Sequence, residues 1–323
     1  MLDDIISQKN VRDALEILRP GRDDNEDAVA RVAWSMIADA NDAQVGALIA
    51  ERGAAEALRA VLQPGVRTPG ARDSRELIEK IPRWRSNAVT AEVAAAIVKS
   101  SHLIGVRLIL PGDAGWSTGM DALGNHRPLL LWTLGAAELL NAPRRIAVIG
   151  ARAATLDGER RAHHFVTDLA ASGVVVNHSG QYGIDAAVAR AALAVDAPSV
   201  AFLAGGLDRL TPYGHEALFS RLAETGLIVT EQSPGSTATR WKLLARNRLL
   251  AANSHAIVIV EAGMRSSNLN VVGHAALLDI PVAAVEGPDD APASAGCNFL
   301  VREQGAISVA SRADVRALLE PTP

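Results

Sequence analysis

The sequence predicts an α/β protein with a doubly wound, mostly parallel sheet, preceded by a small helical domain. Two observations support this prediction. From Arg144 onward, short runs rich in β-branched residues alternate with alanine-rich stretches of helical character, which is typical of repeated β-α units. Nearly all of the short runs are apolar throughout, as expected for strands that are buried on both faces of a sheet.

The amino-terminal part has the periodicity of helices. Between Val11 and Leu62, apolar residues recur at spacings of three and four, and residues 75–99 fit two more helices after a polar interruption at 63–74. We therefore assign residues 1–100 to a helical domain. Residues 103–110 are predicted as a strand, and residues 101–143 as this strand together with the linker into the second domain.

The second domain is predicted to span residues 144–310, followed by a terminal helix or tail at 311–323. Its strands are expected at 145–149, 174–177, 199–203, 227–230, 256–260 and 282–285. Helices are expected at 158–172, 184–195, 213–225, 240–252 and 269–278. The segment from Gly287 to Leu300 is expected to be a loop.

Composition narrows the class of protein. The 323 residues, 49% of them hydrophobic, suffice for a sizeable core and about two domains. No apolar run reaches the roughly 18 residues that a membrane helix needs, and the acidic start lacks the features of a secretory signal, so we expect a cytoplasmic protein without membrane contact. The single cysteine, Cys297, excludes an intrachain disulfide and is interpreted as structural. The net charge of -4 means that any nucleic-acid site must be a local basic patch.

The first strand-to-helix turn has the composition of a phosphate site. Ligands of such sheets collect beyond the carboxyl ends of the strands, where helix amino termini present unpaired amides to an anion. Gly150, Arg152 and Thr155 lie in this turn. The further glycines of a dinucleotide fingerprint are absent, and a simple tight turn with a surface arginine is the alternative.

The second turn, from His178 to Asp185, contains two glycines and leads directly into a helix. Its amides are candidates for an anion cradle. Two roles are open for Tyr182, stacking on a base or packing on the sheet. Asp185 is predicted to have a structural role in capping the helix.

A basic segment follows the fourth strand. No acidic residue occurs between Glu231 and Glu261, an interval that contains Arg240, Lys242, Arg246 and Arg248. At about 100° per residue, Lys242 and Arg246 share a side of the helix and Arg248 points the opposite way, so some of these cations must be structural. Trp241 lies between leucines and cations, and a core position is favoured over base stacking.

Six short motifs follow one another along the second domain. They are Gly-Ala-Arg-Ala-Ala-Thr at 150–155, Tyr-Gly-Ile-Asp at 182–185, Gly-Leu-Asp-(x)3-Pro at 206–212, Arg-Asn-Arg at 246–248, Arg-Ser-(x)2-Leu-Asn at 265–270 and Gly-x-Asn-x-Leu-(x)4-Gly-Ala at 296–306. In order and spacing these motifs resemble the DprA/Smf family (DNA-processing protein A), over about two thirds of the chain. Upstream, Pro111-Gly112-Asp113-(x)2-Trp116 resembles the segment that leads into the family's sheet.

The resemblance implies an extended Rossmann-like fold with an accessory helical domain of the SAM or helix-hairpin-helix type. It also implies sequence-independent binding of single-stranded DNA, homodimerisation and loading of a RecA-type recombinase during DNA uptake. No cofactor, metal or catalytic residue is expected. Motifs and resemblance together give one candidate set for DNA or phosphate contact: Gly150, Arg152, Ser179, Gly180, Tyr182, Gly183, Lys242, Arg246, Asn247, Arg248, Arg265, Ser266 and Asn298.

The chain departs from the family pattern at several positions. Ser267 and Asn268 stand where Gly and Ser or Ala are usual, Val271 where Thr is usual, and Glu286 where Pro is usual. We expect these departures to alter ligand binding. Because the sequence ends at Pro323, we also expect a divergent member without the carboxyl-terminal winged helix of some relatives.

Two other functions are compatible with such a sheet. One is a nucleotide-binding enzyme of the lysine-decarboxylase-like phosphoribohydrolase type, whose Pro-Gly-Gly-x-Gly-Thr-(x)2-Glu stretch has no match here. The other is a nucleotide-sensing module without catalysis, which fits the loops almost equally well.

Overall fold

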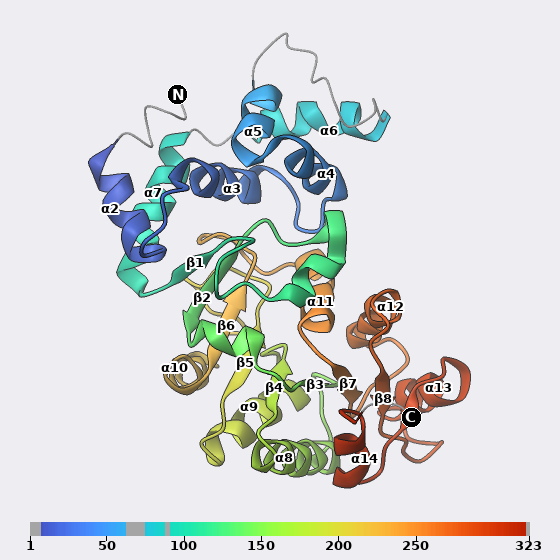
Figure 1. The fold of residues 1–323 in the computed structure, drawn as a ribbon. Helices are drawn as coiled ribbons and strands as arrows, with labels where there is room; N and C mark the ends of the chain where they lie inside the picture. The colour runs from blue at the N-terminus through green and yellow to red at the C-terminus, as the bar shows by residue number, and fades with distance from the viewer. Residues whose placement is uncertain (1–7, 63–74, 88–90, 321–323) are drawn as a thin grey trace.

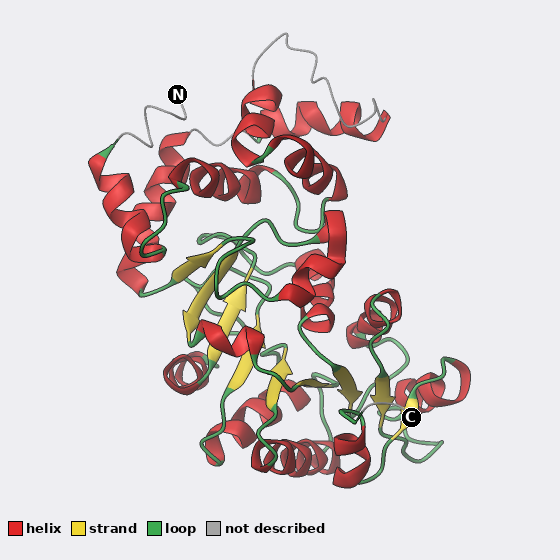
Figure 2. Ribbon diagram, viewed as in Figure 1, coloured by secondary structure: helices red, strands yellow, loops and turns green. Residues whose placement is uncertain are grey.

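A single mixed sheet forms the centre of the molecule, and a helical domain packs on one end of it (Figures 1 and 2). The computed structural model describes residues 8–62, 75–87 and 91–320. Within these ranges the sheet has nine strands in the order β1-β2-β6-β5-β4-β3-β7-β8-β9. The strands are β1 (Arg107–Ile109), β2 (Leu131–Gly135), β3 (Arg145–Ile149), β4 (Val175–His178), β5 (Ser199–Phe202), β6 (Leu227–Thr230), β7 (Ala256–Ile259), β8 (Val282–Ala284) and β9 (Ile307–Ser308).

All pairings among the strands β3 to β9 are parallel. Strands β1 and β2 pair antiparallel and form one edge of the sheet, where β2 is also antiparallel to β6. The chain runs outward from β3 through β4 and β5 to β6 and then returns to place β7 on the other side of β3. The carboxyl ends of β3 and β7 are therefore a topological switch point, where open α/β sheets bind their ligands.

Helices cover both faces of the parallel part. They are α8 (Leu156–Ala171), α9 (Ile184–Ala194), α10 (Glu216–Thr225), α11 (Arg240–Ala252), α12 (Asn270–Leu277), α13 (Ala295–Glu303) and α14 (Arg312–Ala317). Alternate residues of β3 face opposite layers: Ile146 and Val148 pack with α8 and α9, while Ala147 and Ile149 pack with α11. The prediction of strands that are apolar on both faces is thus confirmed.

The amino-terminal helices form one end of the molecule, blue to cyan in Figure 1. They are α2 (Lys9–Leu18), α3 (Asn25–Ile37), α4 (Ala43–Arg52), α5 (Ala54–Leu62), α6 (Arg75–Ser86) and α7 (Ala91–Ser101). Their buried cluster, which includes Trp34 and Trp84, continues through Trp132 of β2 to Ile228 of β6. The helical domain therefore shares a core with the antiparallel edge of the sheet.

The structure corrects some predicted elements. Segment 103–110 contributes only the short strand β1, after a 3-10 turn at His102–Ile104. Strands β2 and β9 were not predicted, and a long 3-10 segment, Thr118–His126, precedes β2. The prediction of a loop as far as residue 300 is wrong, because Ala295–Glu303 is helix α13, which buries Cys297 and Leu300 against the sheet.

Candidate nucleic-acid interface

Segments distant in sequence meet in a small pocket at the switch point. Its walls come from the turns after β3, β4 and β7 and from the middle of α11, which runs back from the carboxyl end of β6. The lining residues are Arg152, Gln181, Leu243, Arg246, Asn247, Ser267 and Asn268. The cavity volume of about 10 Å³ is on the order of a single water molecule. The pocket thus admits a phosphate oxygen, whereas a nucleoside has to lie across its mouth.

The turns after β3 and β4 touch through their main chains. The amide of Ile184 donates to the oxygen of Ala151 at 3.1 Å. Gly183 has φ +71°, and a Cβ on it would lie 2.2 Å from the Ala151 oxygen and 2.5 Å from the Arg152 oxygen. Only glycine fits this conformation and this approach. The backbone of Gly183 therefore lies directly against that of Arg152.

Asp185 links the same two turns from below. Its carboxylate accepts the Ser179 amide at 2.6 Å and the Gly150 amide at 3.2 Å. Complete burial raises the pKa of Asp185, against the lowering effect of these bonds and of the Arg246 charge. Asp185 has a structural role, as predicted, but this role is to join two turns. It does not cap α9, because Gly183 occupies the cap position. Because the amides of Gly150 and Ser179 donate to Asp185, they are not available to a ligand.

Three consecutive amides of the β4–α9 turn remain open to a ligand. The amide of Gly180 donates to Nδ1 of His178 at 3.1 Å. Those of Gln181, Tyr182 and Gly183 make no hydrogen bond to any described residue. Adjacent main-chain amides in a turn that contains residues of positive φ form a concavity suited to an anion.

The first turn has a different arrangement from a dinucleotide site. The Glu261 side chain, from the end of β7, accepts the Thr155 amide at 3.0 Å, and a Cβ on Gly158 would lie 2.2 Å from the same carboxylate oxygen. The Thr155 hydroxyl accepts the Gly158 amide. A buried carboxylate thus fills the place where the pyrophosphate of a dinucleotide would meet the start of α8. In the sequence, Glu261 is only one end of the interval without acidic residues, because its partner Thr155 lies 106 residues away.

Arg246 is a buried support of the pocket. Its Nη1 atom donates to the main-chain oxygens of Ser179 at 2.9 Å and Phe202 at 2.6 Å. Burial lowers the pKa of Arg246 to about 10, and the charge of Asp185 acts against this effect. The guanidinium therefore carries a positive charge at neutral pH, and Ser179 connects it to Asp185, since the Ser179 oxygen accepts from Arg246 and the Ser179 amide donates to Asp185.

Arg248 lies outside the pocket. It is 1% exposed, and its two terminal nitrogens each donate to one oxygen of Glu231 at 2.6 Å. Its Nε atom donates to the oxygen of His126. The structure thus places this side chain in a buried ion pair toward the helical domain, which agrees with the prediction that some cations of the segment are structural.

The other candidate residues are divided between wall and scaffold. Asn247 lines the pocket and donates to Asn270. Ser266 caps the 3-10 turn Ser267–Leu269. The side chain of Asn298 accepts the Gly287 amide and donates to the Gly287 oxygen. Lys242 lines a neighbouring groove, described below. The sequence-based candidate set missed four of the lining residues: Gln181, Leu243, Ser267 and Asn268.

Exposed cations surround this site. Arg152, Arg265 and Arg240 are exposed and form neither an ion pair nor a hydrogen bond through their side chains with the described residues. Trp241 is 77% exposed, so the favoured prediction of a core position is wrong. Tyr182 is 46% exposed. Its hydroxyl donates to the main-chain oxygen of Tyr213, and its ring packs edge-on against His215.

The residues that depart from the family pattern have defined places. Asn268 donates to the Gly150 oxygen and so ties the turn after β7 to the turn after β3. Val271 is fully buried in the α11 layer. Glu286 accepts a hydrogen bond from Ser308 at 2.7 Å and lies 3.5 Å from Arg302, which partly offsets its charge.

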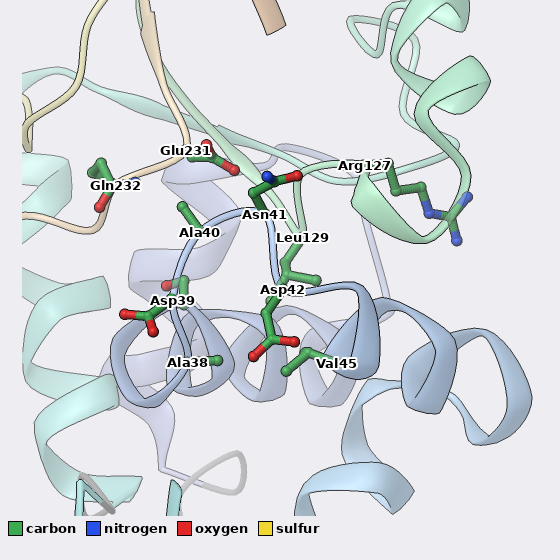
Figure 3. A pocket seen from close by; sticks show the side chains of 11 residues that line it. Ala38, Asp39, Ala40, Asn41, Asp42, Val45, Arg127, Leu129, Glu231 and Gln232 are labelled. Carbon is green, nitrogen blue, oxygen red and sulfur yellow. The ribbon is translucent and has the colours of Figure 1, made fainter. Parts of the chain in front are cut away.

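A second small pocket lies where the helical domain meets the sheet. Figure 3 shows the α3–α4 loop, with Ala40 and Asn41, close to Glu231 and Gln232 after β6. Asn41 also contacts His126, whose oxygen accepts the Nε bond of Arg248. The ion pair of Arg248 is thus part of the contact between the two domains.

Three further features of the described residues concern metal ligands, the thiol and membrane helices. In those ranges, no three His, Cys, Asp or Glu side chains group to hold a metal ion. Cys297 is buried, and burial raises the pKa of its thiol to about 12. None of the described helices has the length and apolar character needed to cross a bilayer.

Comparisons with known proteins agree with the geometry. Residues 107–320 match the family model of DNA recombination-mediator protein A. A putative DNA processing protein DprA from Mycobacterium tuberculosis is 46% identical over 209 residues, which are 61% of this chain and 54% of that protein. Protein Smf from Escherichia coli is 33% identical over 202 residues, 62% of this chain and 54% of its own. The chain thus aligns with about half the length of these two relatives.

Two solved structures share the fold. DNA processing protein A from Streptococcus pneumoniae superposes with a TM-score of 0.72 at 22% identity, covering 91% of this chain and 98% of that one. DNA processing protein A from Helicobacter pylori, the subject of a structural study of its single-stranded DNA binding mode, has a TM-score of 0.59 at 23% identity and covers 65% of this chain and 93% of its own. The predicted α/β architecture is confirmed.

Proposed function

The chain belongs to the family of DNA recombination-mediator protein A, and from this premise we propose that the rim at β3, β4 and β7 binds single-stranded DNA through its phosphates, without sequence preference. The observation that supports this proposal concerns the turns after β3 and β4: within the described residues, the amides of Gln181, Tyr182 and Gly183 make no hydrogen bond, and the nearby guanidinium of Arg152 has no partner. Amides and arginine both bind phosphate oxygens, and contacts with phosphate carry no sequence information.

The same site speaks against a nucleotide-binding enzyme or a nucleotide sensor. Small-molecule sites enclose most of their ligand in roughly 300–1,000 Å³. This pocket has about 10 Å³. The carboxylate of Glu261 also stands at the start of α8, where it would repel a free nucleotide phosphate. A polymer avoids both obstacles, because it lies across the mouth and adds weak contacts along its length.

The proposed mode calls for flexible, single-stranded DNA. A phosphate has to enter a recess formed by four segments of the chain, where Gln181, Arg152 and Arg246 are among the lining residues. A single strand can turn one phosphate inward while its bases point away, whereas a duplex holds its phosphates on a stiff rod. The basic side chains around the pocket then contact neighbouring phosphates.

Binding of fluorescent oligonucleotides tests the proposal. We expect single strands to bind in preference to duplexes, with little dependence on sequence and a steep loss of affinity as salt rises. Arg152→Ala should weaken binding uniformly across sequences and reduce the slope of log affinity against log salt by about 0.7, the value for one phosphate contact on a single strand.

A matched control is Arg221→Ala, which removes an exposed arginine from α10, outside all four lining segments. Arg221→Ala should leave affinity unchanged. Equal affinity of the Arg152→Ala protein and the unchanged protein would refute the contact. Tight binding of a nucleoside monophosphate without oligonucleotide binding would favour the enzyme instead.

The family also leads us to propose a wider role in the cytoplasm: a homodimer that delivers single-stranded DNA to a RecA-type recombinase. Relatives named as DNA processing proteins support this proposal in general terms. Solution mass with and without oligonucleotide tests the dimer, and pull-down of a purified recombinase on DNA-bound protein tests the delivery. A monomer under both conditions, or no retained recombinase, would count against it.

A further inference from the structure

A long groove separates the helical domain from the parallel sheet. Its cavity volume is about 1040 Å³, roughly a hundred times that of the pocket at Arg152. One wall comes from α3, the loop that follows it and α6, and includes Asp39 and Arg83. The other wall comes from the segment after β6 and the start of α11, including Trp241 and Lys242. A cleft of this size holds several nucleotides in extended form.

The groove and the pocket are parts of one surface. Residues 243, 246 and 247 of α11 line the pocket, and residues 241, 242, 244 and 245 of the same helix line the groove. Asn247 of the pocket donates to Asn270 of the groove at 3.4 Å. A strand that leaves the pocket along α11 therefore enters the groove.

Trp241 is the unusual feature of this wall. All five tryptophans lie in described residues, and the other four, Trp34, Trp84, Trp116 and Trp132, are at most 5% exposed. Trp241 is 77% exposed. A large aromatic ring left in water at the edge of a groove is the form of side chain on which nucleic-acid bases stack, and stacking on it requires no particular base.

The charges of the groove favour a polyanion. Asp39 and Arg83 form an ion pair at 2.9 Å and offset each other. Lys242 has no carboxylate at ion-pair distance among the described residues; its ammonium contacts Ser236 and the main-chain oxygen of Thr237. Arg240, exposed and unpaired in the same ranges, stands next to Trp241. The unbalanced charge at this edge is thus positive.

From this juxtaposition we infer that single-stranded DNA continues from the pocket at Arg152 over Trp241 into the groove, with a base stacked on the indole and its phosphates near Lys242 and Arg240. The helical domain then forms one wall of the DNA path. This inference rests on the proposed function and adds to it a second subsite, with an aromatic contact and a role for the amino-terminal helices.

Tryptophan emission gives a direct test on the full chain. Since Trp241 is the one exposed indole of the five, stacking of a base on it should quench part of the emission when an unlabelled oligo-thymidine of about 15 nucleotides is added. In Trp241→Phe this quenching should disappear while the oligonucleotide still binds. Quenching of equal size in the Trp241→Phe protein would place the signal elsewhere and overturn the inference.

Affinity as a function of length tests the path. An oligonucleotide of about 5 nucleotides occupies the pocket, and one of about 15 reaches the groove. Trp241→Ala should weaken the longer one roughly 10-fold and leave the shorter one unchanged, and Trp241→Phe should restore most of the loss. Arg83→Ala should weaken the longer one several-fold. Leu277→Ala, which truncates an apolar side chain that is 84% exposed on α12, is the matched control and should change neither.

The two proposals fail in different ways. If the short oligonucleotide binds in a manner that depends on Arg152, and if the long one binds no better and is insensitive to Trp241, the groove inference alone is overturned. If neither length binds, or if binding is independent of Arg152, the proposed function fails as well.

Discussion

The Arg248 guanidinium meets the Glu231 carboxylate in a two-point ion pair, with both nitrogen–oxygen distances at 2.6 Å and both side chains buried. The pair joins α11 to the end of β6 at the contact with the helical domain. Arg248, which the sequence analysis includes among the candidates for DNA contact, therefore has a structural role.

Removal of one member of this pair should destabilise the protein strongly. Glu231→Gln leaves the buried charge of Arg248 without a counter-ion, which costs about 3–5 kcal/mol. Urea unfolding would measure this loss. A double variant with Arg248→Met should recover part of it, because no unpaired charge remains. Glu286→Gln, at a more exposed pair, is the control and should cost under about 1 kcal/mol; equal losses at the two sites would contradict this account.

Asp185→Asn should loosen the two turns that form the pocket. Asparagine accepts with one oxygen where the carboxylate accepts with two, so the amide of Gly150 or Ser179 loses its partner, at about 1–3 kcal/mol. Oligonucleotide binding should weaken as well. Asp157→Asn is the matched control, since Asp157 also lies in the first turn of a helix but is 71% exposed. The account fails if both variants unfold at the same urea concentration.

Gly183→Ala should be far more damaging than Gly173→Ala. Both glycines have φ near +70°, yet a Cβ on Gly173 meets open space, whereas one on Gly183 meets the main-chain oxygens of Ala151 and Arg152. The shared backbone strain of about 1–2 kcal/mol cancels in the comparison. The excess loss in unfolding free energy and in oligonucleotide affinity therefore reports the contact between the turns. Similar values for both variants would show that the turns do not depend on this approach.

His178 should make stability depend on pH. Burial, assisted by the charge of Arg246, lowers the pKa of His178 to about 3, whereas an unfolded histidine has a pKa of about 6.5. As pH falls, the unfolded chain takes up this proton first. The stability that neutral His178 contributes is complete above about pH 6.5 and is lost on the way down to about pH 3, by about 1.4 kcal/mol per pH unit.

The variant His178→Asn tests this dependence. Asparagine can still accept the Gly180 amide that Nδ1 accepts now, but it does not titrate. Unfolding in urea between about pH 7 and pH 5 should therefore show a shallower slope for this variant. His163→Asn, at an exposed position on α8, should keep the slope of the unchanged protein. A slope of the same steepness after removal of His178 would refute the assignment.

The regular elements of the sheet were accessible from the sequence because burial on both faces gives each strand a continuous apolar run. Strands β3 and β6 and helix α11 have the predicted bounds. Strand β2 was missed because its pairing partners, β1 and β6, are distant in the chain and its flanks resemble a linker. Helix α13 was missed because its start, with Gly296 close under the Ala262 oxygen, has the composition of a turn.

The candidate site was predictable in its position and less so in its roles. The rule that parallel strands end at one rim correctly brought Arg152, Gly183 and Arg246 together. Local sequence does not reveal that Arg248 has a buried partner or that Trp241 lacks a covering element. Such roles depend on contacts between segments that the chain brings together only on folding.

The carboxylate of Glu261 lies at the start of α8, in the place where dinucleotide-binding sheets hold the phosphate of a cofactor. Before any ligand arrives, this carboxylate accepts the Thr155 amide and the Thr155 hydroxyl accepts the Gly158 amide. The polymer that we propose as ligand therefore does not need to place a terminal phosphate at the start of this helix.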